Sequence, residues 1–451
     1  MMNHTQSHST VISTIQLNTS LERSQRCYMQ CEVTAKGFVE LHLKAMSNSH
    51  WQQKNHESAM VRIYVNQQYN QDLILFYGKE SFVYTRLIGQ LEAGTYEIEL
   101  EFREQESPSK VNLVYLEQCE FHWISPASSS ALVYQHTPIL YGRNLSHDYE
   151  STFTDTPLLL MYWMQQKESR TIIEYHMVFS HEDEGTPSGL LMSKWGRTTD
   201  IEWMYRVELD LAGHLLTATY QGPNHVTTAF QGNTDCGGLP ILQAATANGN
   251  FVDEVRSDYR LILPPSYRWY PEQEPREQIM SDYPFTYQVT NWEMNRQYIV
   301  ERNHDASSWK LGDQRQYLFI QSSKFALDVY NSRADVQQTC LDYQVRLQGQ
   351  DEWFSSSFGD LRVADFRAAY QGPDLHFSTT IKLRSGIYVD QIAEIRVTLL
   401  PEGVNRIGVK GIYAFMLDHE YVPTKGIQAS TQVELTSDAP TQTLWSCMAL
   451  I

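Results

Sequence analysis

The chain has 451 residues, about three times the ~150-residue length of a typical domain, so two to four domains are expected. Hydrophobic residues make up 42% and charged residues 20%, which is near the globular average and excludes a disordered or low-complexity chain. The net charge of −18 would repel a phosphate backbone or an anionic membrane surface, and so argues against a nucleic-acid binder.

The N-terminal stretch MMNHTQSHSTVISTIQLNTS lacks the basic and apolar regions of a secretory signal. We therefore expect a cytoplasmic location, while a removed signal or a non-classical route of secretion stay open as alternatives. No window approaches the ~18 consecutive apolar residues of a transmembrane helix, and the richest run, Pro157 to Met164, has only the length of a strand. No transmembrane segment is expected.

The first predicted domain covers residues 1–125. From Cys31 to Trp123, apolar and polar residues alternate between turns, which predicts antiparallel strands with one buried face. In TYEIELEFRE, for example, Ile98 and Leu100 should face a core, while Glu99 and Glu101 should face solvent. This pattern predicts a β-sandwich with an accessory or binding role.

The second predicted domain covers residues 131–305 and has longer strands with irregular connections. Prolines punctuate its second half, where a long irregular loop is expected to cover or frame a site. Its best helix candidate is 284–301, although Thr286, Val289 and Thr290 are poor helix formers.

The third predicted domain covers residues 316–451, where the alternation returns. In AEIRVTLL, three apolar residues alternate with Glu394, Arg396 and Thr398, as in a second sandwich. The sequence therefore predicts an all-β chain of several antiparallel β-sandwich domains with few helices, whose central domain carries the candidate site.

Titratable side chains gather in the central domain. His176 and His181 flank the end of one predicted strand, Asp200 and Glu202 begin the next, and His225 follows on a turn. Residues two apart on a strand share a face, so Asp200 and Glu202 should point into one site, where His225 would complete a set of ligands for Ca²⁺, Mg²⁺ or a transition metal. Alternatively, Asp200 caps the strand, Glu202 is solvated and HEDEG is an acidic turn.

The segments YQHTPILYG, FTDTPLLLMYWM, IIEYHMVFS, GRTTDIEWMYRVELD and QGPNH occur in this order within 134–228. This order resembles two related groups, the plant and fungal vacuolar-sorting-associated proteins and the necrosis-inducing NPP1-like proteins. The resemblance places Asp200 and Glu202 on the acidic positions of the family and His225 on its turn histidine. The family tryptophan between the carboxylates is replaced by Ile201. The resemblance implies a β-sandwich with a divalent-cation site that engages the sugars of membrane sphingolipids.

Two groups of aromatic residues lie in loop-like surroundings. Tyr267, Trp269 and Tyr270 are predicted either to stack on the face of a sugar or to pack onto the sheet that their loop covers. For Trp353 and Phe354 the packing interpretation is preferred.

The cysteines and the short motifs give little indication of a catalytic site. Cys27 and Cys31 are expected to be buried thiols on one strand face, and Cys236 in DCGG to be a turn cysteine rather than a nucleophile. The chain has no signature of a nucleotide or flavin site and no serine-hydrolase or zincin motif.

Three functions follow as hypotheses. The first is a binding protein for a small molecule, and specifically for a glycan or glycolipid head group, assisted by a divalent cation at Asp200, Glu202 and His225. The second is a hydrolase, lyase or cyclase in which His176 or His181 is the base and Asp200 or Glu202 the acid, with His225 nearby. The third is a structural assembly subunit or homo-oligomer.

Overall fold

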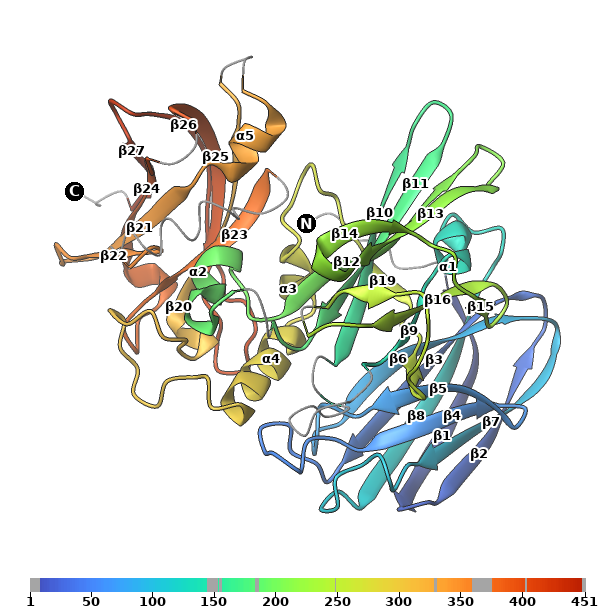
Figure 1. The fold of residues 1–451 in the computed structure, drawn as a ribbon. Coiled ribbons are helices and arrows are strands. Elements are labelled where there is room, and N and C mark those ends of the chain that lie inside the picture. Colours follow the sequence, from blue (N-terminus) through green and yellow to red (C-terminus); the bar gives the residue numbers. More distant parts are fainter. Residues whose placement is uncertain are drawn as a thin grey trace. The chain divides into compact units, whose positions relative to one another are not determined.

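The computed structural model describes residues 9–143, 153, 156–182, 186–247, 249–327, 331–358, 375–401 and 404–447 (Figure 1). The chain divides into two compact units. Unit 1 comprises residues 1–183 and 200–268, and unit 2 comprises 184–199 and 269–451. Both consist mainly of antiparallel strands, which confirms the predicted all-β class with few helices.

Unit 1 begins with a sandwich of two four-stranded sheets (Figure 1). The first sheet has the order β1 (Ser9–Glu22), β8 (Leu113–Ile124), β3 (Gly37–Ser47) and β6 (Phe82–Leu91). The second has the order β2 (Arg26–Val33), β7 (Gly94–Phe102), β4 (Met60–Val65) and β5 (Gln68–Ile74).

The polar face of β7 differs from the expectation. Ile98 and Leu100 are buried as predicted, but Glu99 and Glu101 are buried as well. Arg26 forms ion pairs with both carboxylates, and Tyr64 donates a 2.7 Å hydrogen bond to Glu101. Because buried carboxylates are tolerated when they are paired, strand alternation alone did not predict this burial.

Unit 1 continues with a short helix and two further sheets. Helix α1 spans Ala131–Gln135. The six-stranded sheet has the order β14 (Val226–Ala229), β13 (Leu215–Gly222), β12 (Asp200–Leu209), β11 (Thr171–Phe179), β10 (Pro157–Gln166) and β19 (Pro265–Arg268). The five-stranded sheet has the order β15 (Thr234–Asp235), β16 (Leu239–Ala244), β9 (Ile139–Tyr141) and β18 (Arg260–Leu261), and β17 (Phe251–Val252) pairs with β16.

The first two predicted domains share a hydrophobic core within unit 1. Phe38, Leu87 and Ile124 of the sandwich pack with Tyr134 and Ile262 from later segments. In addition, the Tyr134 hydroxyl donates a 2.5 Å hydrogen bond to the buried carboxylate of Glu40. These contacts explain why residues on both sides of the predicted boundary between domains 1–125 and 131–305 belong to one compact unit.

Unit 2 is built on two four-stranded sheets that share one core. One has the order β23 (His376–Lys382), β20 (Tyr317–Phe325), β25 (Arg406–Phe415) and β26 (Ile427–Thr436), and the other β22 (Trp353–Ser355), β21 (Leu341–Leu347), β24 (Ile392–Leu399) and β27 (Thr441–Ser446). Its helices are α2 (Leu191–Trp195), α3 (Gln278–Asp282), α4 (Phe285–Arg296) and α5 (Arg333–Gln338). Short 3₁₀ turns lie at Ser188–Leu190, Gln314–Gln316 and Val389–Gln391 in this unit and at Pro223–His225 in unit 1.

Residues 269–305, assigned from sequence to the central domain, belong to unit 2. Helix α4 confirms the predicted helix, and Thr290, a poor helix former, lies within hydrogen-bonding distance of the hydroxyl of Thr198 (2.9 Å). Gln314 donates a 3.0 Å hydrogen bond to the same Thr198 hydroxyl, and Arg197 forms a buried ion pair with Glu277. Buried polar contacts, which hydropathy does not report, therefore fix this boundary.

Candidate functional site

Asp200 and Glu202 lie on one face of β12 in unit 1. In the antiparallel register with β11, Asp200 pairs with Phe179 and Glu202 with Met177. The backbone of Gly249 lies directly against the side chains of Asp200 and Glu202. A Cβ atom at this residue would lie 2.5 Å from Asp200 Oδ2 and 3.0 Å from Glu202 Cγ, and its φ of +58° is left-handed. Only glycine fits here without displacement or strain.

The carboxylate of Glu202 also meets the side chain of Gln221 at the end of β13 and that of His225 in the 3₁₀ turn after it. Gln221 Nε2 donates a hydrogen bond to Glu202 Oε2, and His225 Nδ1 lies 3.9 Å from the same oxygen. The Asp200 side chain is buried, while that of His225 is half exposed. We call Asp200, Glu202, Gln221 and His225 the acidic cluster.

The acidic cluster is not arranged as a metal centre. Within the described ranges, no group of three or more His, Cys, Asp or Glu side chains has a geometry that holds a metal ion. His225 Nδ1 lies 3.9 Å from Glu202 Oε2, and this oxygen already accepts a hydrogen bond from Gln221. The three predicted ligands therefore do not surround a common metal position. As they stand, they do not fit Ca²⁺ or Mg²⁺.

His176 lies on the opposite face of β11 from the acidic cluster. Met177 pairs directly with Glu202, so the preceding residue points to the other side of the sheet. There His176 Nε2 forms a 2.8 Å hydrogen bond with Glu174, which also accepts from Trp163 and Arg206. The structure therefore does not bring His176 together with Asp200 and Glu202. His181 is buried just beyond the end of β11.

The buried Glu174 carboxylate is ionised and forms part of the structure. Burial acts to raise its pKa, but His176, Arg206 and Trp163 outweigh that effect and lower the pKa to about 2. Internal partners satisfy the carboxylate of Glu174, as expected of a buried polar group that stabilises a sheet.

The predicted stacking residues are mostly covered. Tyr267 is 1% and Trp269 3% exposed, and Trp269 Nε1 donates a 3.0 Å hydrogen bond to the carbonyl of Glu274. Tyr270 is half-buried. The burial of these rings fits the alternative that they pack down within the protein.

The thiols of β2 match the expectation in part. Cys31 is buried as expected, whereas Cys27, on the same strand face, is half-buried. Burial raises the pKa of Cys236 to about 11, against a smaller lowering effect of Arg260. A thiol with a raised pKa is a poor nucleophile at neutral pH.

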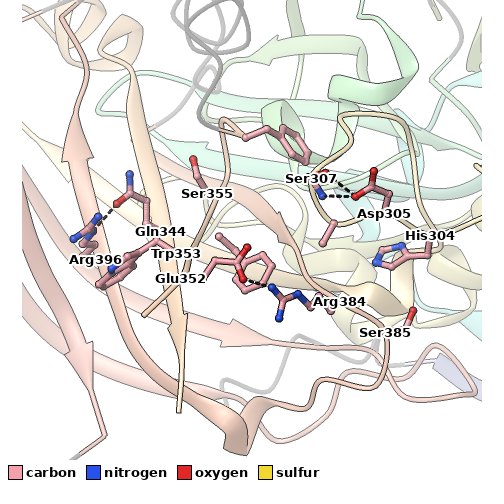
Figure 2. A pocket seen from close by; sticks show the side chains of 13 residues that line it. His304, Asp305, Ser307, Gln344, Glu352, Trp353, Ser355, Arg384, Ser385 and Arg396 are labelled. Carbon is pink, nitrogen blue, oxygen red and sulfur yellow. Dashed lines mark hydrogen bonds and ion pairs between the residues drawn. The ribbon is translucent and has the colours of Figure 1, made fainter. Parts of the chain in front are cut away.

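A pocket in unit 2, here called the Trp353 pocket, has a volume of about 690 Å³. Five segments of the chain line it, and Figure 2 shows the side chains that they contribute. The segments are the loop at 304–307, β21, the residues 352–358 around β22, the loop at 384–385, and β24. All of these segments belong to unit 2.

The sheet register sets one side of the Trp353 pocket. Gln344 of β21 pairs with Ser355 of β22 on one side and with Arg396 of β24 on the other, so the three side chains share a face. The guanidinium of Arg396 lies 3.6 Å from the ring centroid of Trp353, and its Nε donates to Gln344. In Figure 2, Arg396, Gln344 and Trp353 form a group at one end of the pocket.

Charged side chains line the middle and the far end of the pocket (Figure 2). Arg384 forms an ion pair with Glu352 and lies 5.3 Å from the ring centroid of Phe354. Asp305 accepts hydrogen bonds of 2.9 and 2.7 Å from the backbone and hydroxyl of Ser307. The two arginines and the two carboxylates of the lining cancel in formal charge.

A buried lysine anchors the loop that carries His304 and Asp305. Lys382 Nζ lies 2.6 Å from Glu301 and donates to the carbonyls of Ser308 (3.1 Å) and Lys310 (2.8 Å). Burial lowers the pKa of Lys382, and the neighbouring Glu301 opposes this effect. His304 Nε2 adds a 2.6 Å hydrogen bond to the carbonyl of Leu383.

Sequence reasoning found Trp353 and Phe354 but favoured packing for both. Phe354 is buried, whereas Trp353 is half-buried and lines the pocket. Gln344 and Arg396 occupy the polar positions of alternating strands, which read from sequence as a solvated face. A tryptophan on an otherwise polar strand face was the available signal.

No protein-family model matches the sequence, and no curated protein matches it significantly. Solved structures are similar over parts of the chain. A carbohydrate-binding module CBM36 in complex with calcium and xylotriose is 13% identical, covers 26% of this chain and 94% of its own, and has a TM-score of 0.19. A CBM36-1 domain of a xylanase from the hindgut metagenome of Trinervitermes trinervoides is 14% identical, with 25% and 87% coverage and a TM-score of 0.19.

The NLPPya protein in complex with mannosamine is a further structural neighbour, 12% identical, with 32% and 75% coverage and a TM-score of 0.22. TM-scores and identities this low do not indicate the function of this chain.

Among the described residues, no helix is both long and apolar enough to cross a membrane.

Proposed function

We propose that this protein binds carbohydrate and that the Trp353 pocket is the binding site. The observation that carries the proposal is the lining of this pocket, where one half-buried indole stands among amide, hydroxyl, carboxylate and guanidinium groups. A saccharide offers an apolar C–H face to an indole ring and a rim of hydroxyl groups to polar side chains.

The size and charge of the pocket favour this class of ligand. Its volume lies in the ~300–1,000 Å³ range of small-molecule sites. A predominantly apolar ligand would leave many of the polar lining groups without hydrogen bonds, at a cost of about 1–3 kcal/mol for each group that becomes buried. A polyphosphate would meet two carboxylates as well as two arginines.

The acidic cluster of unit 1 is, in our proposal, a second point of contact for the hydroxyl groups of a glycan or glycolipid head group. Glu202, which is partly exposed, supplies an acceptor on the strand face, and the half-exposed His225 marks the side open to solvent, while Asp200 is buried beside Glu202. Since the three predicted ligands do not fit a cation, this part of the proposal rests on the side chains alone.

A glycan array probed with the wild-type protein and with Trp353→Ala tests the proposal. We expect the wild type to bind at least one saccharide class and Trp353→Ala to lose at least tenfold in affinity. Trp309→Ala is the matched control, because Trp309 is an exposed tryptophan of unit 2 outside the pocket lining. Binding that is absent in the folded wild type, or equal in all three proteins, would refute the proposal.

A further inference from the structure

We infer that the Trp353 pocket selects an acidic saccharide, a uronate, and that Arg396 binds its carboxylate. This inference rests on the proposed function and assigns the ligand class of the same site. It follows from how Arg396 is held, from the absence of an ion pair to it among the described residues, and from the charges around it.

Arg396 is held in a fixed plane. Its Nε donates to the amide oxygen of Gln344, and its guanidinium stacks on Trp353 at 3.6 Å from the ring centroid. With Nε engaged, the two terminal nitrogens form the remaining donor edge of the group. A planar guanidinium held in this way is preorganised for two parallel hydrogen bonds to a carboxylate.

Arg396 also differs from the other arginines near it. Arg346 lies 5.7 Å from the same Trp353 ring but pairs with Glu394 at 3.0 Å, and Arg384 pairs with Glu352. Among the described residues, no carboxylate lies within ion-pair distance of Arg396. The carboxylate of Glu394, two residues away on β24, interacts electrostatically with Arg396 but forms its ion pair with Arg346. The half-buried Arg396, which lines the pocket and has no ion pair of its own among the described residues, is therefore suited to an anionic ligand.

The rest of the lining limits the anion to a single charge. Asp305 and Glu352 would repel a phosphate dianion, whereas they accept hydrogen bonds from sugar hydroxyls. Gln344 lies beside Arg396 in the sheet register and Ser355 lies on the other side of Gln344, and both add neutral hydrogen-bonding groups. A uronate combines one carboxylate with several hydroxyls, so it matches both ends of the pocket.

Isothermal titration calorimetry of the full chain tests the inference, with uronate trisaccharides of the gluco and galacto configurations and with their methyl esters. The ester keeps the sugar and removes the charge. For the wild type we expect at least tenfold tighter binding of one acid than of its ester. Arg396→Gln should abolish this preference while it keeps the affinity for the ester, and Arg396→Lys should restore only part of it, because lysine lacks the planar pair of donors.

Arg406→Gln is the matched control and should keep the preference, since Arg406 of unit 2 pairs with Glu434 and lies outside the pocket lining. Equal binding of acid and ester by the wild type, or an unchanged preference in Arg396→Gln, would overturn the inference and leave carbohydrate binding in place. If none of the trisaccharides or their esters binds, and the glycan array is also silent, carbohydrate binding itself fails. Far-ultraviolet circular dichroism of each variant confirms that it is folded.

Discussion

The acidic cluster of unit 1 and the Trp353 pocket of unit 2 differ in how their polar groups are brought together. Asp200 and Glu202 are two residues apart on one strand, and a single glycine closes on them. The pocket instead takes side chains from three strands and two loops, held by sheet register and by a buried lysine. A strand can place two carboxylates by itself, whereas the pocket depends on the tertiary structure of its unit.

The largest expected effect follows from removing the lysine that anchors the pocket loop. In Lys382→Met, Glu301 loses its 2.6 Å partner in a buried environment, and two carbonyls lose their donor. We expect the unfolding free energy of unit 2 to fall by about 3–5 kcal/mol, the usual cost of breaking a buried ion pair. Urea denaturation measures this change.

The double variant Lys382→Met/Glu301→Gln controls for the stranded carboxylate. It should recover part of the loss because no buried charge is left unpaired. A single variant as stable as the wild type would show that the loop is held by other contacts.

The next effect concerns the polar network on the reverse face of β11. Because the pKa of Glu174 is about 2 in the folded chain and near 4.5 when unperturbed, its stabilisation is fully present above about pH 4.5 and is lost as the pH falls toward 2. Glu174→Gln should therefore lose on the order of 3 kcal/mol at pH 7 and progressively less below pH 4.5. Denaturation curves between pH 3 and 7 measure this difference.

Glu208→Gln is the comparison for Glu174, since Glu208 pairs with the part-exposed Arg170 near the end of the same sheet. An exposed pair of this kind is worth about 0–1 kcal/mol. A Glu174→Gln difference that does not change with pH would contradict the assigned role.

The smallest expected effect follows from substitution of Gly249 at the acidic cluster, where close packing and backbone strain can be measured separately. Gly249→Ala should destabilise unit 1 by about 1–3 kcal/mol, because its Cβ would contact Asp200 at a left-handed φ. Gly386→Ala, at φ +79° with no atom within 4 Å of the added Cβ, should show only the cost of the backbone conformation. Equal losses of unfolding free energy in the two variants would mean that the added Cβ at residue 249 makes no close contact with Asp200 and Glu202.

The two regions also show what could be predicted from the sequence. Alternation on β12 predicted that Asp200 and Glu202 share a face, and the all-β class followed from the same pattern. The opposite orientation of His176 was not predictable, because it depends on the register between β11 and β12. Strand alternation does not reveal the partner across a sheet.

The Trp353 pocket was harder to predict for the same reason. Gln344 and Arg396 are neighbours only through the pairing of β21 with β24, and nothing in the local sequence of either strand indicates this contact. Trp353 was named with Phe354 as an aromatic residue in loop-like surroundings, but whether it packs or lines a pocket depends on the loop that Lys382 anchors. Long-range pairing and buried polar contacts thus account for the part that sequence reasoning missed.

A crystal structure of the full chain with a bound uronate trisaccharide tests the central claim most directly. We predict that the sugar occupies the Trp353 pocket, with its carboxylate on the terminal nitrogens of Arg396 and its hydroxyls toward Ser355 and Asp305. A saccharide bound elsewhere, with the Trp353 pocket empty, would contradict the account.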